Sequence, residues 1–263
     1  MESELSADLR SWRTRRRVSQ LELAIRAGTT QRHVSFIESG RSAPGRDMII
    51  RLAESLQVPL RERNQLLVAG GYAPAYDETP YGAPGLGAIR TALEAILEGH
   101  RPYPAVVVDR NGDLVLANNA FHVLTADVDD RLLTGPINIP RLLLDPGGLA
   151  PRIVNFAQWS WHVIDALTRE AAQNPSPAAV ALIHELTALV PPRPAPDHLG
   201  LAVPLHLRSQ HGDLHLITTL TRFGTAIDVT VSELRMEAFL PADEATARAL
   251  RGLDHTMIQP VEV

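Results

Sequence analysis

The side chains best suited to specific chemistry lie in the stretch 19–39, where polar residues are interspersed with aliphatic ones at helical spacing. If the aliphatic residues face inward, Gln31, Arg32 and Ser35 project outward from the start of one helix. Arginine can donate two hydrogen bonds to guanine N7 and O6, and glutamine can pair with adenine N6 and N7. We therefore expect these three side chains to contact base edges in the major groove of double-stranded DNA.

Three more polar side chains, Gln20, Thr30 and Arg41, flank this set. Contacts to phosphate oxygens position a DNA-binding helix without reading the base sequence. We expect Gln20, Thr30 and Arg41 to make contacts of that kind, which strengthen binding to all sequences alike.

Two short helices must hold these side chains. Ser19 and Glu22 have the spacing of a capping box, which begins a first helix. Gly28 can adopt the positive φ that ends that helix sharply, and Thr29 or Thr30 can cap the second. Helix, glycine turn and helix at this spacing are typical of a helix-turn-helix, whose second helix enters the major groove. A helical hairpin that touches no nucleic acid is the alternative.

The length and composition limit the possible classes of protein. The chain has 263 residues, 45% of them hydrophobic, which suits one large or two ordinary domains. It contains no cysteine, which excludes a disulfide framework and a metal site built on thiolates. No apolar run is long enough to span a bilayer, and the first residues are acidic where a signal peptide is basic. We therefore expect a cytoplasmic protein that does not enter a membrane.

The formal net charge of −5 hides an asymmetry between the two parts of the chain. Residues 1–71 carry 12 arginines against 8 acidic residues, whereas residues 72–263 carry 13 arginines against 22 acidic residues. A basic small domain joined to an acidic larger one suits a module that contacts DNA and a second module that does not.

Five helices are expected in the first domain, 1–72. They span about 5–16, 19–27, 30–39, 46–56 and 59–69. A linker follows at 73–87, because this stretch is rich in proline and glycine and has no apolar periodicity.

This domain contains several short motifs: Gln20-x-x-x-Ala24, Glu38-Ser39-Gly40-Arg41, Leu52-Ala53 and Leu66-Leu67-x-Ala69-Gly70-Gly71-Tyr72. Together they resemble the Xre (Cro/cI-type) family of bacterial regulators. One difference is Gly45, which stands where these proteins usually place a serine or threonine cap. That difference costs only a few tenths of a kcal/mol.

The second domain, 88–252, is expected to be α+β, with a tail at 253–263. Strands are predicted at 104–108, 114–118, 203–208, 213–223 and 226–239, and helices at 89–97, 119–125, 138–144, 150–172 and 176–189. A change of apolar parity near Ser232-Glu233 predicts a bulge in the last strand. This order favours a PAS-like domain, a five-stranded antiparallel sheet with inserted helices on one face.

A second resemblance covers this domain. It rests on Ala105–Val108, Leu116-Ala117-Asn118-Asn119-Ala120, Ile153-Val154-Asn155-Phe156, Phe223-Gly224-Thr225-Ala226-Ile227-Asp228-Val229-Thr230 and Glu237-Ala238-Phe239-Leu240-Pro241. These runs resemble the MmyB-like ligand-binding domain found in Xre-type regulators. The resemblance implies a PAS-like fold and an acyl or fatty-acid-like ligand.

The predicted helix 150–172 carries the candidate ligand residues. One stripe, Asn155, Trp159, His162 and Ala166, combines aromatic surface with an amide and an imidazole, which suits an amphipathic ligand. The expected apolar walls are Phe121, Leu124, Phe156, Trp159 and Trp161, and the expected head-group partners are Arg152, Asn155 and His162. In the alternative interpretation, Trp159 is a half-buried core residue and the polar members of the stripe face water.

Histidine spacing raises the question of a metal site. His206 and His215 are expected to face each other across a hairpin with its loop at Ser209–Gly212. No third ligand is evident, so the pattern favours a solvated pair, and no metal or cofactor is expected. His184-Glu185 lacks the second histidine of a zincin helix, and no nucleophile, phosphate-loop or dinucleotide motif occurs. Enzyme activity is not expected.

These patterns favour a sequence-specific transcription regulator, expected to be a repressor, that senses a small amphipathic ligand such as a fatty acid. One module makes few contacts, so a homodimer on an inverted-repeat operator is expected, with its dimer contacts in the second domain. Two alternatives stay open. In one, the second domain only dimerises or binds a protein partner; in the other, it acts catalytically on a lipid.

Overall fold

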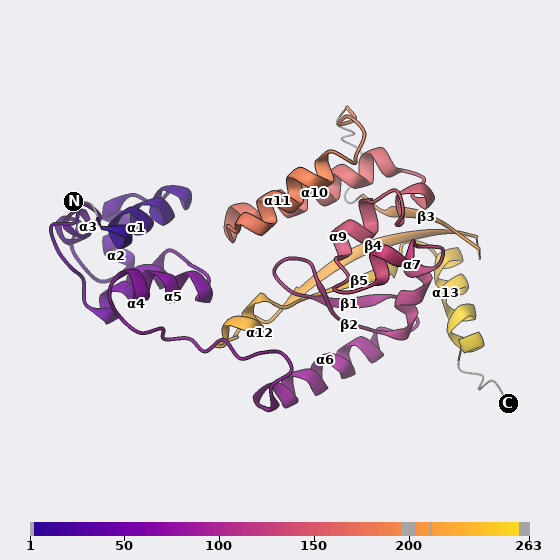
Figure 1. Ribbon diagram of the computed structural model, residues 1–263, viewed down its shortest axis with the longest axis horizontal. Coiled ribbons are helices and arrows are strands. Elements are labelled where there is room, and N and C mark those ends of the chain that lie inside the picture. The colour runs from indigo at the N-terminus through magenta and orange to yellow at the C-terminus, as the bar shows by residue number, and fades with distance from the viewer. Residues whose placement is uncertain (1–2, 196–202, 211, 258–263) are drawn as a thin grey trace. The chain divides into compact units, whose positions relative to one another are not determined.

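The computed structural model describes residues 3–195, 203–210 and 212–257 (Figure 1). The chain forms two compact units: the residues up to Tyr81 together with Thr225–Ser232 make the first, and the remaining residues make the second. Each unit has its own buried apolar core. The predicted α+β class, with an all-helical part before a sheet, is confirmed.

Residues 3–81 fold into five α-helices at the positions expected from the sequence. They are α1 (Glu4–Arg15), α2 (Gln20–Arg26), α3 (Gln31–Glu38), α4 (Arg46–Ser55) and α5 (Leu60–Ala69). Each helix contributes to one core, as shown by side chains that are at most 1% exposed: Leu9, Leu23, Ile37, Leu52 and Leu67.

The turn between α2 and α3 follows its local sequence. The Ser19 hydroxyl accepts a hydrogen bond from the Glu22 backbone N–H (3.1 Å), and the Thr30 hydroxyl accepts one from the His33 backbone N–H (3.1 Å). Gly28 has a φ of 63°, a left-handed conformation that glycine adopts without a Cβ clash. The predicted starts of both helices are therefore confirmed.

A buried carboxylate connects three of these helices. Glu38, at the end of α3, is 4% exposed. Its Oε1 and Oε2 accept hydrogen bonds from Arg13 Nε (2.6 Å) and Nη2 (2.9 Å), and Oε2 also accepts one from Gln20 Nε2 (2.8 Å). The hydrogen bond to Glu38 raises the pKa of Arg13. Because Arg13 belongs to α1 and Gln20 begins α2, this side chain fixes α3 against both helices.

The second unit is built on a five-stranded antiparallel sheet in the order β2-β1-β5-β4-β3. The strands are β1 (Ala105–Val108), β2 (Leu114–Ala117), β3 (Leu205–Ser209), β4 (Gly212–Arg222) and β5 (Arg235–Pro241). The sheet predicted for the PAS-like domain is therefore confirmed. All four residues of β1 are 0% exposed, which requires cover on both faces of the sheet.

Helices cover both faces of the sheet, and not one face as predicted (Figure 1). On one face lie α9 (Ile139–Leu144), α10 (Phe156–Gln173) and α11 (Pro177–Thr187), and α6 (Gly87–Gly99) packs against β1 from the other. The shorter segments are η1 (Pro84–Leu86), η2 (Asn119–Phe121), α7 (His122–Thr125), α8 (Asp130–Leu133) and η3 (Ala150–Arg152). No helix in the described part of the chain is both long and apolar enough to cross a bilayer.

The predicted helix 150–172 is interrupted after η3. Ile153 forms an isolated bridge with Leu207, and the Val154 backbone N–H donates to the carbonyl of His206 (2.8 Å). Helix α10 consequently begins only at Phe156. The interruption comes from pairing with a strand that lies far along the chain, which local periodicity does not reveal.

The predicted strand 226–239 is wrong in its first half, where helix α12 (Val229–Glu233) precedes β5. Asp228 starts this helix: Oδ1 accepts from the Val231 N–H (3.2 Å) and Oδ2 from the Thr79 N–H (3.1 Å). The Val229 N–H donates to the carbonyl of Asp77 (2.8 Å). The change of parity near Ser232 therefore marks a helical turn and not a bulge. A further helix, α13 (Glu244–Met257), for which no prediction was made, packs on β4 and β5.

Replacing Glu38 should destabilise the first unit strongly. We expect Glu38→Gln to lower the free energy of unfolding by about 3 kcal/mol, because it leaves the Arg13 charge without its buried partner. Urea denaturation measures this loss. The control is Glu54→Gln, whose carboxylate lies 3.4 Å from Arg63 and is 53% exposed. That change should cost less than about 0.5 kcal/mol, and equal losses in the two variants would contradict the role assigned to Glu38.

Candidate functional site

The outer face of α3 carries the predicted base-reading residues. Val34 and Ile37 are each 1% exposed and point into the core, as expected. Gln31 and Arg32 are exposed and Ser35 is partly exposed on the opposite side of the helix. The structure thus brings Gln31, Arg32 and Ser35 together on one surface, and their contact with base edges stays a prediction.

Phe36 organises this surface, although its role was not anticipated from the sequence. The Arg32 guanidinium lies 5.1 Å from the centre of the Phe36 ring, and that of Arg41 lies 5.8 Å from it. Cation–π contacts of this kind hold both charges near one edge of α3. The spacing of Arg32 and Phe36, one helical turn apart, is the sequence signal that could have revealed the pair.

The predicted phosphate-contacting residues already have partners within the protein. Thr30 caps α3 through its hydroxyl, Gln20 donates to Glu38, and Arg41 stacks on Phe36. Arg41 is exposed, and Gln20 is partly exposed. Side chains held in place in this way lose less freedom when they bind a phosphate, and their contact with phosphates stays a prediction.

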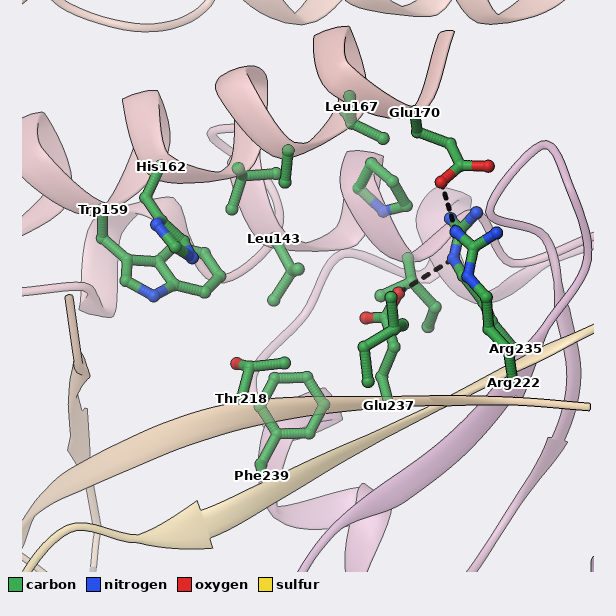
Figure 2. A pocket seen from close by; sticks show the side chains of 15 residues that line it. Leu143, Trp159, His162, Leu167, Glu170, Thr218, Arg222, Arg235, Glu237 and Phe239 are labelled. Atoms are coloured by element: carbon green, nitrogen blue, oxygen red, sulfur yellow. Dashed lines mark hydrogen bonds and ion pairs between the residues drawn. The ribbon is translucent and has the colours of Figure 1, made fainter. Parts of the chain in front are cut away.

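A cavity of about 200 Å³ lies between the sheet and α10 in the second unit (Figure 2). Its apolar walls include Leu143 of α9, Trp159 and Ala166 of α10, and Phe239 of β5. Trp159 is 2% exposed and Phe239 is 1% exposed, so both rings also belong to the core. The cavity therefore has rigid walls that can contact a hydrocarbon.

One end of the cavity is charged. Arg222 of β4 and Arg235 of β5 are direct partners across the two strands, an arrangement that is unfavourable unless anions neutralise it. Glu170 of α10 pairs with Arg222, and Glu237 Oε1 accepts from Arg235 Nε at 3.2 Å (Figure 2). Burial raises the pKa of Glu170, but hydrogen bonds from Arg222 and Asn174 lower it by more than burial raises it. The pKa of Glu170 therefore lies below the usual value.

Glu170, Arg222, Arg235 and Glu237 were not identified from the sequence. For Glu170 a signal existed, because it continues the predicted stripe Trp159, His162 and Ala166 by one more turn of α10. Arg235, Glu237 and Phe239 alternate along β5 and share a face, but the incorrect strand 226–239 obscured this pattern.

His162 lines the cavity beside Trp159, as predicted. His162 is exposed as a residue, but partial burial lowers the pKa of His162, and the charge of Arg169 lowers it further, although Asp165 opposes the shift. The imidazole is therefore neutral at pH 7 and can accept or donate a hydrogen bond without carrying charge.

The other predicted ligand residues lie outside the lining of this cavity. Phe121 and Leu124 are buried in the core, and Phe156 packs against it. Trp161 Nε1 donates to the carbonyl of Pro191 (2.9 Å) while Arg193 stacks on the ring at 4.3 Å. These four side chains therefore contribute to packing elsewhere in the domain and not to the walls of the cavity.

Arg152 and Asn155, two of the predicted head-group partners, make structural contacts. Arg152 Nη2 donates to the carbonyl of Leu124 (2.7 Å), and burial lowers the pKa of Arg152 although Asp127 opposes the shift. Asn155 Nδ2 donates to the carbonyl of Pro204 (2.8 Å), and its Oδ1 accepts from the His206 N–H (3.1 Å). Both side chains join the segment before α10 to other elements.

The two histidines of the β3–β4 hairpin face each other as predicted. His206 and His215 are direct partners, with ring centres 4.2 Å apart and an interplanar angle of 80°. Each ring has its own carboxylate, Asp213 at 3.1 Å and Asp243 at 2.7 Å. Within the described residues, no group of three histidine or acidic side chains could hold a metal ion.

Comparisons with known proteins identify both units. A family model described as MmyB-like transcription regulator ligand binding domain matches residues 89–253. A model described as Helix-turn-helix matches residues 9–63. A search of curated proteins found no match.

Trp159 should be essential for the stability of the second unit. We expect Trp159→Ala to lower the free energy of unfolding by about 3–5 kcal/mol, because it removes a fully buried ring from a packed core. Trp161→Ala should cost clearly less, since that ring is partly exposed. Urea denaturation followed by circular dichroism measures both, and a smaller loss for Trp159→Ala than for Trp161→Ala would contradict the assignment.

Proposed function

Because this chain belongs to the MmyB-like transcription regulators, we propose that it is a repressor whose DNA binding responds to a fatty-acid-like ligand. The chain is a DNA-binding transcriptional regulator with a ligand-binding domain, and neither of its matched domains is catalytic. The observation that carries the ligand proposal is an apolar cavity with a polar end, where Arg222 and Arg235 lie beside Glu170 and Glu237.

The DNA contacts in this proposal come from α3. Arg32 and Gln31 read base edges, Ser35 lies beside them, and Gln20, Thr30 and Arg41 contact phosphates. The exposure of Gln31 and Arg32 supports this division, as does the tethering of Arg32 and Arg41 to Phe36. One module makes few base contacts, so two copies would bind an inverted repeat with half-sites about one helical turn apart, or a multiple of it.

Arg32 and Arg41 should affect DNA binding differently. We expect Arg32→Ala to weaken operator binding by about 1–3 kcal/mol and to relax specificity at one base pair. Arg41→Ala should weaken binding to operator and random DNA alike and reduce the salt slope by about 1. Titrations against both DNAs at several salt concentrations distinguish the two effects. An unchanged base preference in Arg32→Ala would contradict base reading by this residue.

The ligand in this proposal lies along the cavity. Its hydrocarbon chain contacts Leu143, Trp159 and Phe239, and its head group lies near Arg222 and Arg235. These two arginines replace the partners Arg152 and Asn155 expected from the sequence. The Nε–Glu237 bond leaves the terminal nitrogens of Arg235 able to donate, and the Arg235 side chain is 8% exposed. Burying each CH₂ contributes about 0.8 kcal/mol, so a medium-length chain supplies useful affinity.

Filling the cavity should abolish ligand binding without harming DNA binding. Ala166 lines the cavity yet is exposed, so Ala166→Trp can occupy the space without disturbing the core. We expect this variant to lose laurate binding by calorimetry and to bind operator DNA like the parent. Ala172→Trp, also on the exposed surface of α10 but outside the lining, is the matched control and should bind laurate normally.

If the parent binds no laurate and Ala166→Trp behaves like it, the fatty-acid assignment is wrong. The alternative, in which the second domain only dimerises or binds a protein partner, would then be preferred.

Regulation requires that the ligand bind the DNA-competent and DNA-incompetent states with different affinities. Helix α6 follows the linker, so the order of elements along the chain suggests that it transmits the effect of the ligand to the DNA-binding unit. The connection between β4 and β5 supports an additional route, because its residues Thr225–Ser232 belong to the first unit. Arg222 and Arg235, which border the cavity, lie three residues before and after this segment.

A further inference from the structure

The charged end of the cavity already contains as many anions as cations. Arg222 and Arg235 are opposed across β4 and β5, and Glu170 and Glu237 neutralise them. A ligand carboxylate that enters this cluster is therefore a third anion beside two cations. Its binding must depend on how readily one of the protein's own carboxylates gives up its place, because like charges at short distance oppose each other.

Glu170 is better placed than Glu237 to give up its position. Its side chain extends from α10, 24% exposed, to meet the Arg222 side chain, which is 39% exposed. Glu237, which is 18% exposed, belongs to β5 itself, as does its partner Arg235, which is 8% exposed. A flexible side chain at the open part of the cavity can move aside at less cost than one that stands on a central strand.

The contacts of Glu170 are those that a bound carboxylate would make. One oxygen accepts from Arg222 and the other accepts from Asn174. Both hydrogen bonds and the charge of Arg235 lower the pKa of Glu170 against the effect of burial, so the group is an anion at pH 7. The position beside Arg222 is thus occupied by a carboxylate that the protein itself supplies.

We propose that Glu170 determines the head-group preference of the cavity. An anionic head group must displace its carboxylate from Arg222, whereas an uncharged hydroxyl head group binds without displacing it. The inference rests on the proposed binding of an amphipathic ligand in this cavity. It makes Glu170 a specificity-determining residue that favours uncharged head groups and weakens the binding of free acids.

The test compares laurate with dodecanol, which share a twelve-carbon chain and differ in head-group charge. Their dissociation constants are measured by calorimetry for the full-length protein and for Glu170→Gln. We expect Glu170→Gln to bind laurate about tenfold more tightly and to bind dodecanol within about twofold of the parent. The two compounds are compared within each variant, because the ratio of their dissociation constants does not depend on the fraction of folded protein.

Two further variants identify the cause. Glu185→Gln removes another glutamate that is paired with an arginine, Arg141, but lies outside the cavity lining, and it should leave the ratio unchanged. In the Arg222→Gln background, Glu170→Gln should lose its effect on laurate, because the two residues act on each other.

The possible results separate this inference from the proposal on which it rests. An unchanged laurate-to-dodecanol ratio in Glu170→Gln, or an equal gain for both compounds, overturns the role of Glu170 and leaves ligand binding intact. If neither compound binds the parent protein or any variant, the proposed ligand class fails and the inference fails with it.

Discussion

The carboxylate of Glu38 sets the geometry of the DNA-binding unit. Removing a charge from water is unfavourable unless its oxygen atoms are fully paired, and Glu38 reaches its partners only where α1, α2 and α3 meet. The end of α3 is therefore held from two sides by hydrogen bonds and not by apolar packing alone. The outer face of the same helix shares this orientation, so Glu38 helps to set where α3 presents Arg32, whose side chain is then held by Phe36.

The second unit uses a glutamate and an arginine in a different setting. Glu170 is held on α10 by Arg222 and Asn174, but it borders a cavity and part of its side chain meets solvent. Water or a ligand can replace its contacts, which is not possible for Glu38 inside the first unit. A glutamate–arginine pair thus has fixed contacts where it is buried, and contacts that water or a ligand can replace where it lines a cavity. Burial, and not residue identity, distinguishes the two uses.

Local signals predicted the first unit well. The caps at Ser19 and Thr30 and the glycine turn at Gly28 depend on neighbours within a few residues, so the sequence is sufficient to locate α2 and α3. The hairpin of β1 and β2 was also recoverable, because its asparagine–glycine turn is a local signal. Long-range interactions account for the misses. Helix α10 starts late because Ile153 pairs with Leu207, and the charged end of the cavity forms only when α10, β4 and β5 come together.

The segment Thr225–Ser232 belongs to the first unit, although the chain enters it from β4 and leaves it into β5. The polypeptide consequently crosses between the two units three times. A single crossover at the linker would therefore separate the two stretches of this unit. A fragment that ends at Tyr81 lacks Asp228 and Val229, whose bonds to residues 77–79 then have no donor or acceptor. A fusion that keeps only the first stretch therefore keeps the helical core, whose residues all lie before residue 73, but loses the hydrogen bonds that Asp228 and Val229 make with the linker.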